Sequence, residues 1–400
     1  MNDLYNYYRD ILKNELFPCA FVDLEKFNEN IIGIMNRMSS YDKTIRVASK
    51  SIRVPFLLEK IFQSNSKFQG ILSYKAEEAV YLSKKGFKDI LVAYPIWNNK
   101  EIIMISDQIR EGGEITLMVD SSEHIKRANL IAQEQNLIIP LCIDIDMSSK
   151  HLNLHFGVYR SSITTSGQVI SLANLIDQYS NVKLDGVMGY EAQIAGIADR
   201  SPAKNFVINR VIRFLKKRSI KELRNRRKKI VSSLKEQGYS LRFVNGGGTG
   251  SIESTSGEKI VTEVTVGSGF FSPVLFDYYD SFKHQPALSF ALEITRKPAP
   301  NIYTCHGGGY VASGSMGIDK IPKPYLPEGC KLVKNEAAGE VQTPIIYKKK
   351  QYNLQIGDPI FMRHSKAGEL CEHFNEILLI SEGKIINRFP TYRGEGKKFL

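Results

Sequence analysis

The sequence has few cysteines, and their arrangement does not suggest crosslinks. There are five in 400 residues, an odd number, and no two are spaced as a CxxC pair. They are Cys19, Cys142, Cys305, Cys330 and Cys371. Scattered cysteines of this kind argue against a disulfide framework and for free thiols in a reducing compartment.

Signals for membranes and for export are also missing. No apolar run reaches the length that spans a bilayer. No N-terminal stretch combines a basic start, an apolar core and a small-residue cleavage site. Hydrophobic residues make up 42% and charged residues 24%, as is usual for globular proteins. We therefore expect a cytoplasmic protein with no membrane partner.

Positive charge is in excess, but nothing beside it indicates a nucleic-acid partner. The net charge is +12, and much of the excess lies in the run KKRSIKELRNRRKK at residues 216–229. No aromatic residue interrupts this run, and no recognised nucleic-acid motif is present. We interpret the run as a solvated helix face, with attraction of anionic substrates or cofactors as a compatible benefit.

What the sequence does have is a repeated alternation from about Ile45 to Thr265. Short runs rich in Val, Ile and Leu alternate with segments of helical spacing. The apolar runs are 45–49, 70–73, 89–94, 114–120, 141–146, 184–190, 241–247 and 261–266. Apolar strands separated by helices predict a parallel sheet covered by helices. Eight such units fit an α/β fold with a closed (β/α)8 barrel better than an open doubly wound sheet.

The pattern changes near Ser281. Short strand-like runs, such as 377–389, are separated by Gly, Pro, Asn and Asp turns, and helical periodicity disappears. This is typical of a smaller all-β domain. We therefore expect three parts, which are an N-terminal segment (1–20) that packs on the β domain, a β/α barrel (21–280) and a C-terminal β domain (281–400).

The first apolar run ends at a lysine, Lys50. In a β/α barrel the reactive groups lie at the carboxyl ends of the strands. A lysine at this end points into the mouth of the barrel, where its amine is suited to imine formation. The alternative is an ordinary surface lysine, since the sequence has many.

Two glycine clusters follow the seventh and eighth runs, GGGTG at 246–250 and GSG at 267–269. Backbone amides of such loops converge on an anion, and phosphate sites in barrels often follow these two strands. No Gly-Lys-Ser/Thr follows, which excludes a P-loop. A lysine and a phosphate site at one mouth together indicate a phosphorylated aldehyde, and pyridoxal 5′-phosphate (PLP) fits this requirement.

Several segments carry a resemblance to a known family. PCAFVDLEKFNENI (18–31) and RVASKSIR (46–53) resemble the N-terminal segment and the cofactor-lysine strand of alanine-racemase-like (fold type III) PLP enzymes. FVNGGGTG (243–250) resembles the phosphate loop of their D-threonine aldolase and D-serine dehydratase branch. MRHSKAGELCEHFNE (362–376) and PTYRGEGKKFL (390–400) resemble the end of members described as amino-acid deaminase/aldolase.

The resemblance implies roles for particular residues. Lys50 would bind PLP as a Schiff base and act in catalysis, together with Tyr190 and His155. The cofactor would also be held by Arg160, Gln193, Gly247, Gly248, Thr249, Gly250, Ser268 and Gly269. A hydrogen-bonded structural histidine explains His155 about as well.

The same resemblance raises the question of a divalent metal. Members of this branch place one on a His-x-Asp or His-x-Cys pair in the β domain. Here His364 is followed two residues later by Lys366, and a lysine does not serve as a ligand beside a cation. Either His364 and Cys371 bind the metal through a different loop path, or the metal is absent and Lys366 replaces its charge.

A third glycine-rich segment, HGGGYVASG (306–314), is most simply a set of tight turns in the β domain. The resemblance also implies a homodimer whose subunits share their active sites, with His306 and Tyr310 near that shared region.

The activity that the resemblance implies is a lyase acting on a β-hydroxy amino acid of D configuration. After the substrate amine displaces Lys50, retro-aldol cleavage gives glycine and an aldehyde, whereas dehydration gives an oxo acid and ammonia. Two alternatives remain open. One is a PLP-dependent racemase or epimerase, which needs a base on each face of the ring, and the other is a barrel that binds PLP without catalysis.

Overall fold

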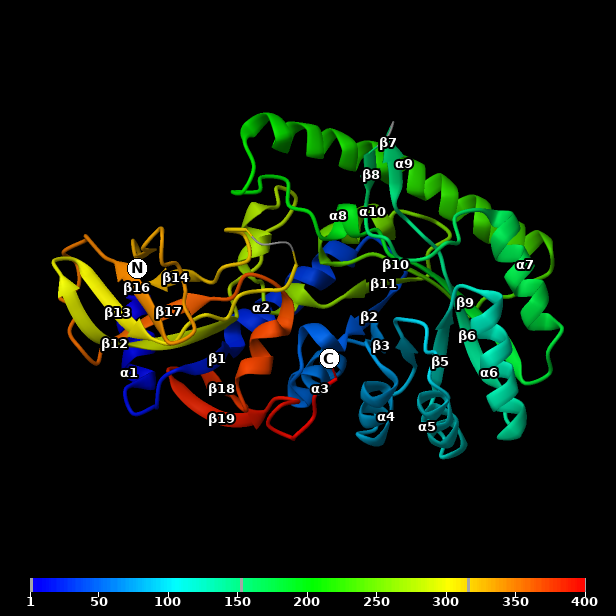
Figure 1. Cartoon of the computed structure of the whole chain (residues 1–400), viewed down its shortest axis with the longest axis horizontal. Coiled ribbons are helices and arrows are strands. Elements are labelled where there is room, and N and C mark those ends of the chain that lie inside the picture. Colours follow the sequence, from blue (N-terminus) through cyan, green and yellow to red (C-terminus); the bar gives the residue numbers. More distant parts are fainter. Residues whose placement is uncertain (1–2, 152–153, 315–316, 400) are drawn as a thin grey trace.

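The computed structural model describes residues 3–151, 154–314 and 317–399. Its centre is a closed barrel of parallel strands in the order β10-β11-β2-β3-β4-β5-β6-β9 (Figure 1). The barrel strands are β2 (Thr44–Ala48), β3 (Phe68–Ser73), β4 (Ile90–Val92), β5 (Ile115–Val119), β6 (Ile139–Asp144), β9 (Val182–Gly189), β10 (Phe243–Gly246) and β11 (Glu263–Val266). Each coincides with one of the apolar runs, so the predicted α/β barrel is confirmed.

Helices cover the outside of the barrel and bury one apolar face each (Figure 1). They are α2 (Leu24–Met38), α3 (Pro55–Ser64), α4 (Ala76–Lys84), α5 (Asn99–Arg110), α6 (Ser122–Glu134), α7 (Ser166–Asp177) and α9 (Phe206–Glu236). Asn98, Ser121 and Thr165 cap α5, α6 and α7 by accepting hydrogen bonds from the first turn. None of the described helices is long and apolar enough to cross a membrane.

The inside of the barrel is filled in two layers below the mouth. At the amino ends of the strands, fully buried Arg46 pairs with Glu263 at 2.6 Å and with Asp89 at 2.8 Å. Above this ionic layer lies an apolar layer, formed by Leu72, Leu91, Met118, Cys142, Met188 and Phe243. Open space therefore begins only at the carboxyl ends of the strands.

The second domain is a nine-stranded sheet in the described residues, with the main order β15-β16-β13-β12-β1-β18-β19, and with β17 and β14 branching from β12. Its strands are β1 (Cys19–Asp23), β12 (Leu288–Ala299), β13 (Ile302–His306), β14 (Lys323–Leu326), β15 (Lys331–Leu332), β16 (Gln342–Ile346), β17 (Pro359–Arg363), β18 (Glu376–Ser381) and β19 (Lys384–Pro390). The separate, mostly-sheet domain expected from the sequence is therefore present.

The N-terminal residues lie in this second sheet. Strand β1 pairs antiparallel with β12 and parallel with β18. Helix α1 (Leu4–Leu12) packs beside it, where the Tyr5 hydroxyl donates to the Pro359 carbonyl at 3.2 Å. The boundary expected between residues 20 and 21 falls inside β1, because the chain enters the barrel only when α2 begins at Leu24.

The basic run 216–229 corrects one expectation, because it is not a uniformly solvated helix face. It forms the middle of α9, and two of its basic residues turn inward. Lys216 pairs with Asp199 at 2.7 Å, and Arg227 is 1% exposed at its side chain. The composition of the run could not indicate this, because each inward-facing basic residue pairs with a carboxylate that lies outside the run.

Candidate active site

A cavity of about 210 Å³ opens at the mouth of the barrel. Ends of several strands contribute to its wall, as the sequence predicts for reactive groups. The polar side chains that line it are those of Lys50, Ser51, Ser73, Tyr94, Arg160, Tyr190, Asn245, Thr249, Thr265, Ser268 and Lys366. The cavity thus brings together Lys50 and both glycine clusters.

Lys50 lies in a short 3-10 turn, η1 (Ser49–Ser51), directly after β2. The Arg53 side chain donates to the Lys50 carbonyl at 2.8 Å and forms an ion pair with Glu372 at 2.8 Å. Arg53 holds this position with a positive φ of 57°, which a non-glycine residue rarely adopts. The Arg53 side chain therefore fixes the lysine turn and also contacts the second domain.

The first glycine cluster forms a tight loop after β10. Gly247 has a φ of 86° and would place a Cβ 2.6 Å from Val264, so this position requires glycine. The Gly247 N–H donates to Glu191 at 3.1 Å, and the Gly248 N–H donates to Ser251 at 3.1 Å. The N–H groups of Thr249 and Gly250 have no acceptor among the described residues.

A buried ion-pair group lies behind this loop. The Glu191 carboxylate accepts from Gly247 and Ser251 and pairs with Arg227 at 3.0 Å. Arg227 also pairs with Glu258 at 2.6 Å. Both partners of Arg227 are buried carboxylates, so the Arg227 cation neutralises their charge. One of them, Glu191, is the carboxylate that accepts from the glycine loop.

The second glycine cluster forms the facing edge through the 3-10 turn η3 (Ser268–Phe270). The Gly269 N–H donates to the Thr249 hydroxyl at 3.0 Å, which joins the two clusters. A Cβ at Gly267 would lie 2.7 Å from the Ser51 hydroxyl, so this turn also packs against the lysine turn. The Ser268 N–H has no acceptor in the described part of the chain.

These features fit PLP. Three uncommitted backbone N–H groups, at Thr249, Gly250 and Ser268, lie at the joined glycine edges, where phosphate oxygens require donors. Lys50 lines the same cavity, whose wall combines polar side chains with apolar ones such as those of Leu72, Met188 and Phe276. The residues present therefore provide an anion cradle and an amine for an aldehyde in one space.

Arg160 and Tyr190 lie on the remaining wall. Arg160 pairs with buried Asp144 at 2.6 Å, and its guanidinium lies 4.6 Å from the Tyr94 ring centroid. Burial raises the pKa of Asp144 to about 6, although Arg160 opposes this shift. Burial, followed by the Glu191 charge, raises the pKa of Tyr190 to about 12, so its phenol is protonated at neutral pH.

Four of the predicted catalytic and cofactor residues do not line the cavity, namely Gly250, Gly269, Gln193 and His155. The two glycines directly follow the lining residues Thr249 and Ser268. Gln193 is buried and donates to the Met147 carbonyl at 2.6 Å. His155 lies in strand β8 (Leu154–Phe156) and stacks on Tyr159 with ring centroids 4.0 Å apart. Both side chains take part in local packing beside the mouth rather than in its wall.

The predicted metal residues are buried but do not form a ligand cluster. No group of three His, Cys, Asp or Glu within the described ranges has the arrangement to hold a metal ion. Burial, followed by Arg363, lowers the pKa of His364 to about 3, and burial raises the pKa of the Cys371 thiol to about 12. With no third His, Cys, Asp or Glu in the described residues to complete a ligand group, this donor set does not fit a metal.

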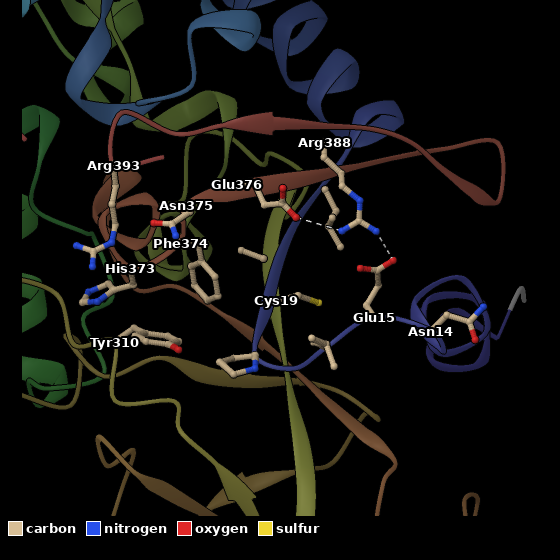
Figure 2. A pocket seen from close by; sticks show the side chains of 14 residues that line it. Asn14, Glu15, Cys19, Tyr310, His373, Phe374, Asn375, Glu376, Arg388 and Arg393 are labelled. Carbon is tan, nitrogen blue, oxygen red and sulfur yellow. Dashed lines mark hydrogen bonds and ion pairs between the residues drawn. The ribbon is translucent and has the colours of Figure 1, made fainter. Parts of the chain in front are cut away.

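Tyr310 lines a different cavity, of about 460 Å³, in the second domain (Figure 2). Its ring lies beside His373, with centroids 4.8 Å apart. Across the same cavity, Arg388 bridges Glu15 and Glu376 at 2.6 and 3.1 Å (Figure 2). His306 is exposed at the end of β13.

Some residues of the site were missed by sequence reasoning. Tyr94 ends the run 89–94, and strand order alone would have placed it at the mouth. Glu191 follows Tyr190 directly, yet its role depends on Arg227 from a distant helix. No sequence pattern indicates that second contact.

Comparisons with known proteins agree with this geometry. The family model described as "Alanine racemase, N-terminal domain" matches residues 22–272. The chain belongs to this family. The match covers the barrel and both glycine clusters, so the recognition made from sequence segments is confirmed.

Similar proteins within this alanine-racemase-like family are named as lyases. The chain is 24% identical over 397 residues to a 3-hydroxy-D-aspartate aldolase of Paracoccus denitrificans (strain Pd 1222), covering 95% of this chain and 92% of that protein. A solved D-threonine aldolase from Filomicrobium marinum superposes with a TM-score of 0.79 at 15% identity, covering 96% of each chain. The chain is accordingly a lyase of this family.

A second solved structure, of a dehydratase, is also similar to this chain. It is D-threo-3-hydroxyaspartate dehydratase, solved as a cysteine-to-alanine mutant in the metal-free form. It superposes with a TM-score of 0.75 at 16% identity, covering 96% of this chain and 99% of that one. At this identity the likeness shows the fold.

Proposed function

We propose that this chain is a PLP-dependent lyase that cleaves or dehydrates a β-hydroxy D-amino acid at the barrel mouth, with Lys50 as the lysine that bears the cofactor. The observation that carries the proposal is that one cavity is lined by Lys50 and by both glycine clusters, including Thr249 and Ser268, whose N–H groups are uncommitted in the described residues. The names of the similar aldolases and dehydratases support the substrate class.

When bound, PLP supplies an electron sink for the negative charge that develops at the substrate Cα. The residues of the chain provide binding, orientation and proton transfer. The Thr249, Gly250 and Ser268 N–H groups would hold the phosphate, and Arg160, fixed by Asp144, would orient the ring or the substrate carboxylate. The Lys50 amine would take or return a proton at the substrate Cα.

Tyr190 provides the second proton-bearing group. Its phenol stays protonated at neutral pH, because its pKa is raised to about 12, so it is a hydrogen-bond donor for a substrate in the cavity that it lines. A phenol facing the substrate together with Lys50 also suits the alternative of a racemase, which moves the Cα proton between two faces. The two activities differ in whether the β-carbon bond or only the Cα–H bond breaks.

The test is incubation of the purified, PLP-loaded protein with D-threonine, D-serine and 3-hydroxy-D-aspartate. Aldehyde with glycine identifies retro-aldol cleavage, and an oxo acid with ammonia identifies dehydration. Exchange of Cα hydrogen for deuterium without breakdown identifies a racemase instead. If no β-hydroxy amino acid gives a product, the proposed lyase activity is wrong.

The homodimer expected from the sequence remains a prediction. Light scattering on the purified protein tests it, with a molar mass twice that of the chain as the expected result. Binding of PLP is tested separately by absorbance, because an imine of PLP absorbs in the visible or near-ultraviolet, where protein side chains do not.

A further inference from the structure

A second lysine, Lys366, lines the cavity that holds Lys50. It comes from the β domain rather than from a barrel strand. After β17 the chain stays extended, and the carbonyls of His364 and Ser365 accept from the N–H groups of Val274 and Leu275 at 3.0 and 3.1 Å. This pairing brings Lys366 to the same wall as Leu275 and Phe276.

The segment after Lys366 packs closely against the lysine turn. The 3-10 segment η5 (Ala367–His373) contains Gly368, where a Cβ would lie 2.4 Å from the Ser51 carbonyl oxygen. At its far end, Glu372 pairs with Arg53, which also holds the Lys50 carbonyl. Lys366 therefore has a set position relative to Lys50, although the two lie far apart in sequence.

The Lys366 ammonium has only weak partners in the described residues. It lies 3.3 and 3.5 Å from the carbonyl and hydroxyl oxygens of Ser313 and 3.9 Å from Glu369. The Glu369 carboxylate is itself occupied by the Ser313 N–H and hydroxyl, at 2.8 and 2.6 Å. Strong charge-assisted hydrogen bonds are shorter, about 2.7–2.9 Å, so this cation is available to a ligand.

The same place is poorly suited to a divalent metal. His364 is 2% exposed and is not among the residues that line the cavity. Of the pair His364 and Lys366, the lysine is the residue that reaches the cavity. A metal placed there would meet a like charge instead of an anionic ligand.

We propose that Lys366 takes the place of a divalent metal, with its ammonium donating to the β-oxygen of the substrate, so that the reaction needs no added cation. This inference rests on the proposed function. Negative charge builds on the β-oxygen both when the Cα–Cβ bond breaks and when the β-oxygen leaves. A fixed cation at that point stabilises either transition state. Lys366 forms no covalent bond in this role.

The first test is metal dependence of the PLP-loaded protein. We expect metal analysis to find much less than one divalent ion per chain, and product formation to be unchanged after EDTA treatment and after addition of Mn²⁺. One bound metal per chain, or activity lost in EDTA and restored by Mn²⁺, overturns the proposal.

The second test compares Lys366→Gln, Lys366→Arg and the control Lys384→Gln, which removes an exposed lysine of the same domain outside the cavity. For Lys366→Gln we expect kcat to fall about 100-fold or more, as on loss of an oxyanion donor. Lys366→Arg should retain most of the activity, and the control should match wild type. Wild-type kcat in Lys366→Gln, or a change confined to KM, overturns the proposal.

A binding readout separates this inference from the proposed function. The imine absorbance of Lys366→Gln should equal that of wild type, which shows an intact fold and cofactor site. In spectral titrations, its affinity should fall for D-serine and stay unchanged for D-alanine, which lacks the β-oxygen. Equal affinity for both relative to wild type overturns the inference. If wild type gives no product from any β-hydroxy amino acid, the proposed function fails, and metal content and these titrations still decide the role of Lys366.

Discussion

The two sides of the cavity are built in different ways. On the barrel side, Lys50 and the glycine clusters stand at the carboxyl ends of β2, β10 and β11, so the closed sheet sets their positions. On the side of the β domain, Lys366 directly precedes η5 and is held by a few specific contacts. More than 300 residues separate it from Lys50 in the sequence. The barrel side contains the features that we propose bind the cofactor, and the other side carries the charge that we propose faces the substrate.

This difference indicates which side of the cavity tolerates substitution. Backbone N–H groups on the barrel side depend on turn geometry, which tolerates few changes. A side chain on the β-domain side is replaced by one substitution, and its neighbours need little adjustment. We therefore expect barrel-side variants to lose the cofactor, and β-domain variants to keep it while losing turnover.

Lys50→Ala should have the largest effect. Without this amine the imine absorbance disappears, and we expect product formation to fall by about 10³-fold or more, as on removal of an essential covalent residue. The control is Lys100→Ala, an exposed lysine at the start of α5. Imine absorbance that persists in Lys50→Ala would show that a different lysine bears the cofactor.

Arg227→Leu tests the support behind the glycine loop. It leaves the carboxylates of Glu191 and Glu258 buried without their cation, so we expect a loss of about 3–5 kcal/mol in the free energy of unfolding. The affinity for PLP should fall as well, since Glu191 holds the Gly247 N–H. Urea unfolding and PLP titration measure the two effects. Lys228→Leu, at the exposed neighbouring position, should change stability by no more than about 0.5 kcal/mol.

Gly368→Ala is the corresponding test on the β-domain side. The added Cβ would meet the Ser51 carbonyl, and we expect overpacking to cost about 1–3 kcal/mol. The clash lies at the lysine turn, which directly follows β2, so we expect η5 to shift rather than that turn, and the imine absorbance to remain while kcat falls. Gly167→Ala, in α7 with open space around it, is the matched control and should be as stable as wild type or more so. Loss of PLP from Gly368→Ala would contradict the division between the two sides.

The smallest effect concerns pH and His284, which lies against Arg37. Arg37 donates to the Thr249 carbonyl at 2.8 Å and to the His284 ring at 3.1 Å, and also pairs with Glu253. Burial, followed by the Arg37 charge, lowers the pKa of His284 to about 4, while the opposite charge of Glu253 raises it. Unfolded histidine titrates at about 6.5, so the unfolded chain binds more protons between these values.

The stability that neutral His284 contributes is therefore fully present above about pH 6.5, and it is lost as the pH falls towards 4. We expect His284 to account for about 1–2 kcal/mol of the loss in unfolding free energy between pH 6.5 and 5. Urea unfolding at several pH values should show a flatter pH dependence for His284→Gln. The variant His306→Gln, which changes an exposed histidine, should keep the wild-type slope. An unchanged slope in His284→Gln would contradict the assignment.

Much of the barrel side was predictable because its information is local. The run 45–49 reads as a strand from its apolar residues, and strand order alone places Lys50 at the mouth. The glycines at 246–250 and 267–269 indicate tight turns by composition. The placement of Gln193 and His155 outside the cavity was not predictable, since it depends on the hydrogen bond of Gln193 to the Met147 carbonyl and on the stacking of His155 on Tyr159.

The sequence by itself determined the barrel, the order of its strands and the presence of a lysine and glycine-rich turns at one end. Periodicity and strand counting suffice for these features, because they arise from the physics of short segments. Only the tertiary structure decided that Arg227 supports the glycine loop from α9, that β1 belongs to the second sheet, and that Lys366 rather than His364 reaches the cavity. Those contacts join residues far apart in the chain, and only tertiary packing brings such residues together.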